Sequence, residues 1–103
     1  MKLSEPVRKV LGALHEDGGF EEIKDITRSL VNDEGIPSDV ALDQAMEMFD
    51  AMIDFDRLLN GRFEKLGDAL EKADGPIIAA LIRPLMRLAV RRLLKPWVQS
   101  GMP

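Results

Sequence analysis

The sequence predicts an all-α fold, a compact four- or five-helix bundle that ends in an amphipathic basic helix. Apolar residues recur every three or four positions along most of the chain, which is the helical period. No segment alternates apolar and polar residues for long enough to indicate a strand, and short breaks rich in Gly, Pro, Asn and Asp separate the periodic segments. Because 103 residues are the length of one domain, we expect a single domain over 1–103.

The first two helices are predicted on either side of a glycine pair. Ser4 is a good N-cap, and Pro6 suits a first turn, where its missing N–H has no partner to lose. Gly18 and Gly19 end this helix. The second helix then begins at Phe20, with acidic residues in its first turns, where the helix dipole favours negative charge.

A third, longer helix opens at Pro37 with Ser38 as its N-cap, and the turn at 60–61 ends it. At about 100° per residue, five of its six acidic side chains fall within an arc of roughly 80°, whereas Asp56 falls on the apolar side. The five acids within the arc are Asp39, Asp43, Glu47, Asp50 and Asp54. A fourth helix is expected from Phe63 to about Ala73, before a clear break.

The fifth helix is predicted over 76–96, closed by Pro96 and followed by a tail over 97–103. Pro84 should kink this helix or split it in two. More than half of its circumference is apolar. Its basic residues are Arg83, Arg87 and Arg91, spaced four apart, with Arg92 and Lys95 near the C-terminal end. These arginines make a transmembrane helix too costly.

Charge divides the chain into an acidic helical body over 1–75 and a basic C-terminal segment. Residues 1–75 hold nine basic and all 18 acidic residues, a net charge of −9, whereas residues 76–103 hold five basic residues and no acid. The acidic stripe of the third helix matches the arginine stripe of the fifth in spacing. We therefore expect an ion-pair ladder, either between two packed helices of one chain or across a two-fold axis.

Composition excludes several classes of function. The chain has no Cys and one His, which removes thiolate and multi-histidine metal sites and cysteine nucleophiles, and we expect no cofactor. The net charge of −4 argues against nucleic-acid binding, as do the acids that a helix-turn-helix would present to phosphates. The N-terminus shows no apolar signal region, so a cytoplasmic location is expected.

One pair of acidic motifs suggests an enzyme as an alternative. The run Glu21-Glu22-Ile-Lys-Asp25 is followed by Glu47-Met-Phe-Asp50 on the next predicted helix. This pattern resembles the all-helical nucleoside-triphosphate pyrophosphatases of the MazG type, over residues 21–50 at most. The resemblance implies a magnesium-dependent activity, with Glu22, Asp25, Glu47 and Asp50 as metal ligands. The chain departs from that family by having Asp25 where the family has Glu, and by lacking a recognisable basic phosphate-binding motif downstream.

The function predicted first is a non-enzymatic protein–protein interaction module, such as a regulator, adaptor, assembly chaperone or inhibitor, that binds a protein partner or itself as a homo-oligomer. The charged helix faces would orient the partner, through Asp43, Glu47, Asp50, Asp54, Arg83, Arg87, Arg91 and Arg92. Apolar residues that include Met48, Phe55 and Met86 would supply affinity. A further alternative is a peripheral membrane protein held by the fifth helix, with Trp97 as an interface anchor.

Overall fold

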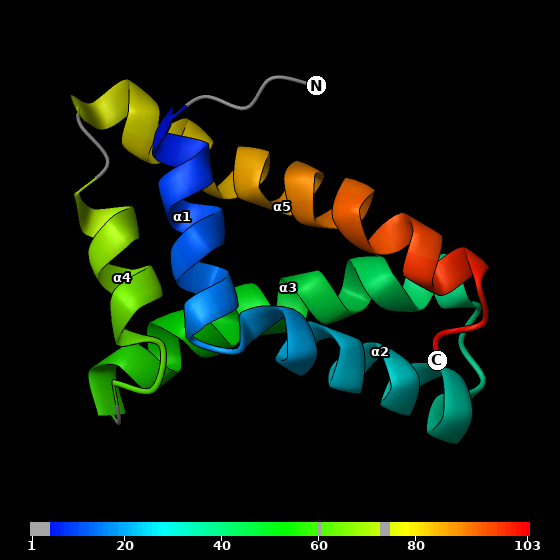
Figure 1. Ribbon diagram of the computed structural model, residues 1–103. Coiled ribbons are helices and arrows are strands. Elements are labelled where there is room, and N and C mark those ends of the chain that lie inside the picture. The colour runs from blue at the N-terminus through cyan, green and yellow to red at the C-terminus, as the bar shows by residue number, and fades with distance from the viewer. Residues whose placement is uncertain (1–4, 60, 73–74) are drawn as a thin grey trace.

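A computed structural model describes residues 5–59, 61–72 and 75–103, except for the side chains of 56–59 and 75–79. Within these ranges the chain is all-helical and contains no strand, which confirms the predicted fold class. In chain order the helices are α1 (Glu5–Glu16), α2 (Gly19–Glu34), α3 (Ser38–Leu59), α4 (Glu64–Glu71) and α5 (Gly75–Gln99) (Figure 1).

The helices form a flat bundle. Helices α2 and α3 pack as a hairpin, α1 packs beside α4, and α5 runs back along α3 from one end of the molecule to the other (Figure 1). The bundle measures 40 × 35 × 21 Å. Since a helix with its side chains is about 10–12 Å across, the bundle is two helices thick along its shortest axis.

The core draws on every helix. At its centre the rings of Phe49 and Phe63 meet edge to face, with centroids 5.0 Å apart. Around them lie buried residues from α1 (Val7, Val10, Leu11, Leu14), α2 (Ile23), α3 (Leu42, Ala45, Met46, Ile53), α4 (Leu66, Leu70) and α5 (Ile82, Met86, Ala89, Val90, Leu94). Helices α3 and α5 are therefore each packed into the core along one side.

The tight corner between α1 and α2 depends on two glycines. Gly18 adopts a φ of 77°, in the left-handed region that glycine enters without strain. A Cβ on Gly19 would lie only 2.8 Å from Cγ of Leu14, which is fully buried. The sequence predicts this break correctly, and packing against Leu14 explains why the second position is also a glycine.

A long-range cap begins α4. Phe63, at the N-cap position, offers no side-chain acceptor. Instead the backbone N–H of Leu66 donates to Oδ2 of Asp17, 2.8 Å away, from the corner between α1 and α2. Sequence reasoning missed this cap because the two residues are 49 positions apart and meet only after folding.

The predicted end of the last helix is wrong. Pro96 does not close α5, which continues to Gln99. A proline in the last turn removes one hydrogen bond, and contacts further along offset that loss. Trp97 is half-buried against α2, with its ring 5.3 Å from Nζ of Lys24 and 5.1 Å from Cζ of Arg28. These cation–π contacts hold the turn that follows Pro96 in place.

The residues after the helix also fold back. The carbonyl oxygen of Pro103 accepts hydrogen bonds from Nη2 of Arg28 at 3.2 Å and from Nε1 of Trp97 at 3.4 Å. The predicted tail over 97–103 is therefore part of the packed structure. Likewise Pro84 does not split α5, because Ile82 and Met86 on either side of it are buried in the core.

Candidate functional site

An ion-pair ladder joins α3 to α5 within one chain. Arg83 meets Asp54 in a forked contact, with Nη2 to Oδ1 at 2.6 Å and Nη1 to Oδ2 at 3.3 Å. Its Nη1 also lies 3.4 Å from Oδ1 of Asp50, whose other oxygen accepts from Nη2 of Arg87 at 2.7 Å. The sequence left open whether the ladder would form within one chain or across a two-fold axis, and the structure has it within the chain.

The far end of the ladder is a separate pair, in which Nε of Arg91 donates to Oδ1 of Asp43 at 2.9 Å. The pairing is antiparallel, because Asp43 is joined to the later arginine and Asp54 to the earlier one. What we call the ladder consists of Asp43, Asp50 and Asp54 with Arg83, Arg87 and Arg91. It fixes the register of α5 along α3.

Burial differs along the ladder. The Asp50 side chain, which serves two arginines, is 17% exposed, whereas that of Asp43 is 48% exposed. Exposed pairs contribute about 0–1 kcal/mol each, since water screens them. The outer pairs therefore set the orientation of the two helices more than they stabilise the fold, and Asp50 is the member on which the geometry depends most.

Two predicted site residues do not belong to the ladder. Glu47 is exposed, and at about 100° per residue it lies at the solvent side of the arc that Asp43, Asp50 and Asp54 occupy. Arg92 is also exposed and follows Arg91 onto the outer side of α5. The structure thus brings together six of the eight residues that the sequence placed in one charged site.

Exposed apolar side chains are concentrated on the same two helices. Seven large ones are 43–66% exposed: Val40, Met48 and Phe55 on α3, and Leu81, Leu85, Leu88 and Leu93 on α5. Among the described side chains, α1, α2 and α4 contribute none to this set. Isolated exposed leucines are ordinary, but a set confined to two neighbouring helices marks a candidate interaction surface.

The spacing arranges most of these residues in two lines. Met48 and Phe55, seven residues apart, form what we call the α3 stripe, and Leu81, Leu85 and Leu88, spaced by four and three, form the α5 stripe. Met86 was predicted to join this apolar surface, but it is buried in the core at 5% exposure. That prediction is wrong because Met86 lies on the opposite side of α5 from the stripe.

A shallow hollow of about 470 Å³ connects the ladder to the α5 stripe. Its floor and rim are formed by Asp50, Ala80, Arg83, Pro84, Arg87, Leu88 and Arg91. Charged groups that are already paired therefore border an apolar recess on the surface of α5. Such a recess can accept a side chain of a partner without leaving an arginine desolvated and unpaired.

The acidic residues that the pyrophosphatase resemblance implies are not gathered at a metal site. Glu22 contacts Arg62 at 2.9 Å, and Asp25 contacts Arg28 at 2.8 Å. Asp50 belongs to the ladder. Among the described residues, no group of three or more His, Asp or Glu side chains is placed to hold a metal ion. The four carboxylates therefore do not form the ligand set that the resemblance implies.

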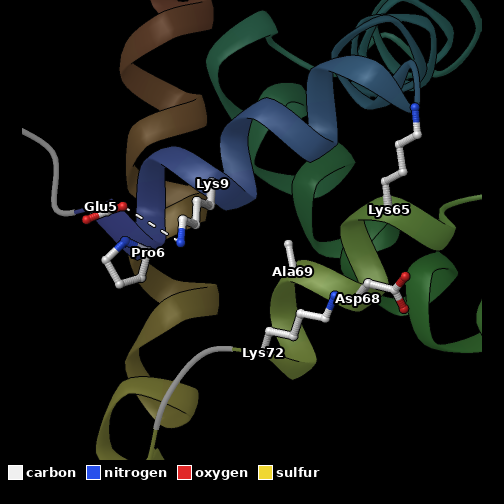
Figure 2. A pocket seen from close by; sticks show the side chains of 7 residues that line it. All are labelled: Glu5, Pro6, Lys9, Lys65, Asp68, Ala69 and Lys72. Carbon is white, nitrogen blue, oxygen red and sulfur yellow. Dashed lines mark ion pairs between the residues drawn. The ribbon is translucent and has the colours of Figure 1, made fainter.

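Another groove, of about 480 Å³, lies between α1 and α4 (Figure 2). Lys9, Lys65 and Lys72 stand on its rim, and Ala69 points into it. Nζ of Lys9 lies 3.7 Å from Glu5, and Nζ of Lys65 lies 3.4 Å from Glu16. Because carboxylates accompany two of the three lysines, the groove has little excess positive charge with which to attract an anion.

No described helix is long and apolar enough to cross a membrane. The residue predicted to anchor a membrane-bound helix, Trp97, has its ring against Lys24 and Arg28 of α2. Trp97 therefore contacts another helix of the same bundle.

Comparison with known proteins found no family model, curated protein or solved structure that matches this chain. The conclusion about function therefore rests on the geometry of the α3–α5 surface.

Proposed function

We propose that this chain is a non-enzymatic protein–protein interaction module that binds its partner through the outer sides of α3 and α5. One observation carries the proposal: among the side chains that the structure describes, the seven large apolar ones that are exposed all lie on the two helices that the ladder joins. Apolar stripes at helical spacing suit a partner that is itself helical.

In this proposal the ladder holds α3 and α5 in position relative to each other. Its arginines and aspartates bond to one another, which supports a role in holding α3 and α5 at one separation and register. The two stripes are then fixed relative to each other before a partner arrives. Preorganisation of this kind favours affinity, because fewer groups lose freedom when the complex forms.

Affinity would come from the apolar side chains beside the ladder. Phe55 is the largest exposed apolar residue of the set, and Leu88 lies at the hollow next to Arg87 and Arg91. Large apolar side chains near the centre of an interface commonly carry most of its binding energy. Glu47 and Arg92, exposed and outside the ladder, would contribute to the choice of partner at the rim.

Photo-cross-linking from single positions tests the proposal. A photo-activatable residue at position 55 or 88 should give a discrete cross-linked species in the expressing cell, and Leu85→Glu should abolish it. Matched controls place the same residue at Arg8 on α1 or Lys72 on α4, both of which are exposed. Equal cross-linking from all four positions, or none from 55 and 88, would contradict the proposal.

A further inference from the structure

We propose that residues 97–103, which we call the strap, switch between a closed state packed on α2 and an open state in which α5 ends at Pro96. This change is independent of the proposed function. Local and tertiary preferences conflict at this end of α5, because the proline favours an end to the helix whereas contacts with α2 extend it to Gln99. Where such preferences conflict, two arrangements of the chain can differ little in free energy.

Pro96 stands where the burial of α5 falls off. Leu94, two residues earlier, is 5% exposed and belongs to the core, whereas Trp97 is half-buried and Ser100 is exposed. Pro96 has no N–H, so it cannot donate the helical hydrogen bond at this position. The backbone is thus weakest where the strap leaves the core, and a break there leaves Leu94 and the residues before it packed.

Two basic side chains of α2 hold the strap closed. Nζ of Lys24 lies 5.3 Å and Cζ of Arg28 5.1 Å from the centre of the Trp97 ring. Nη2 of Arg28 also donates to the carbonyl oxygen of Pro103 at 3.2 Å, and half-buried Val98 packs against the core. The side chains of Lys24 and Arg28 are themselves partly exposed, so water competes for their contacts. Contacts of modest strength therefore oppose the local preference for ending the helix.

The hydrogen bonds of the strap should break together when it opens. The backbone N–H groups of Ser100, Gly101 and Met102 donate to carbonyl oxygens of the preceding turn, at 3.0, 3.2 and 3.0 Å. The last two of these bonds have the pattern of a Schellman cap. All three require a helical backbone beyond Pro96. The open state therefore loses them as one set, together with the contacts on α2.

Opening would uncover the surfaces of Trp97 and Arg28 that touch each other in the closed state. A molecule that binds either group only when it is uncovered would shift the chain toward the open state. The size of the shift depends on how far its affinities for the two states differ. The end of α5 would then respond to binding while the core stays as it is.

Amide hydrogen exchange tests the switch directly. In the unmodified protein the amides of Ser100, Gly101 and Met102 should share one opening constant to within about twofold, at least about tenfold larger than that of buried Val90. Three unequal constants would show stepwise fraying. Constants equal to that of Val90 would show that the strap opens only when the bundle unfolds. Either result would overturn the proposal.

Two substitutions should move the equilibrium in opposite directions. Arg28→Ala removes a cation–π contact and a hydrogen bond, and should raise the shared opening constant about three- to tenfold. Pro96→Ala restores an N–H within the helix and should lower that constant about tenfold or more. Arg8→Ala, at an exposed position of α1, is the matched control and should leave it unchanged.

The exchange of the Val90 amide and the far-UV circular dichroism spectrum monitor the bundle in each variant, and neither should change. An unchanged strap constant in Arg28→Ala would mean that α2 does not hold the strap. An unchanged constant in Pro96→Ala would mean that the proline does not favour the open state. Each of these results would overturn the switch.

Discussion

Phe49 and Phe55 are six residues apart on α3, yet their surroundings differ sharply. Phe49 is 1% exposed and packs edge to face on Phe63, whereas Phe55 is 66% exposed. The same contrast holds on α5 between buried Met86 and exposed Leu85. Both helices are thus apolar on two sides, one used by the fold and one left on the surface. Substitutions on the inner side should reduce stability, and those on the outer side should reduce association.

The largest expected effect is Phe49→Ala. Removing a buried aromatic ring costs the transfer energy of its atoms and leaves a cavity, so we expect a loss of about 3–5 kcal/mol in unfolding free energy. Urea denaturation measures it. Phe55→Ala is the matched control and should change stability by less than about 0.5 kcal/mol. Equal losses for the two variants would mean that Phe55 is packed within the fold.

A methyl group added at Gly19, at the α1–α2 corner, or at Gly12, within α1, should likewise distinguish a buried position from an exposed one. Gly19→Ala forces a Cβ towards buried Leu14 and should destabilise the chain by about 1–3 kcal/mol. Gly12, within α1, has nothing within 4 Å of its added Cβ, so Gly12→Ala should stabilise by about 0.5–1 kcal/mol through helix propensity. Thermal unfolding measures both changes in stability, and we expect a lower melting temperature for Gly19→Ala and a higher one for Gly12→Ala. A lower melting temperature for Gly12→Ala as well would contradict the free space around its added Cβ.

The ladder should give intermediate effects that depend on burial. Asp50→Asn weakens contacts to both Arg83 and Arg87 and should cost about 1–2 kcal/mol, because this carboxylate is mostly buried. Asp43→Asn, at an exposed pair, should cost about 0–1 kcal/mol. Urea denaturation measures the loss in unfolding free energy for each variant. Urea is uncharged, so it does not screen the ion pairs. A larger loss of unfolding free energy for Asp43→Asn than for Asp50→Asn would contradict the conclusion that the ladder depends most on Asp50.

The smallest effect on stability is expected on the α5 stripe. Leu85→Gln should leave the unfolding free energy within about 0.5 kcal/mol of the original, since the Leu85 side chain is 43% exposed. The same variant should abolish cross-linking from position 88. A variant that loses stability and cross-linking together would place Leu85 in the fold rather than on the interaction surface.

Much of the fold could be predicted from local signals. The helical period, the glycine pair at 18–19 and the break before Ser38 identify the helices and their order. Local rules for proline predict an end to the helix at Pro96 and a kink or a split at Pro84; the end at Pro96 is wrong and the split at Pro84 does not occur, because contacts elsewhere in the chain keep the helix continuous. At Pro84 those contacts are with the core, and at Pro96 they are with α2 through Trp97.

The candidate site could be predicted only in part. Spacing alone indicated that Asp43, Asp50 and Asp54 could match three arginines, because charges four residues apart lie on one side of a helix. Spacing could not show that Glu47 and Arg92 lie outside the ladder, which depends on how α3 and α5 are rotated about their axes. Nor could it separate buried Met86 from exposed Leu85, since both belong to a helix that is apolar over most of its circumference.

The sequence by itself determined the helical class, the order of the helices and the segregation of charge, since each follows from residues within a few turns of one another. Only the tertiary structure decided which apolar side of α3 and α5 is buried, that the ladder closes within one chain, and that Asp17 caps α4 from 49 residues away. The physical reason is that burial and long-range pairing depend on the rotation and register of whole helices. Those are set by the packing of the core and not by any local segment.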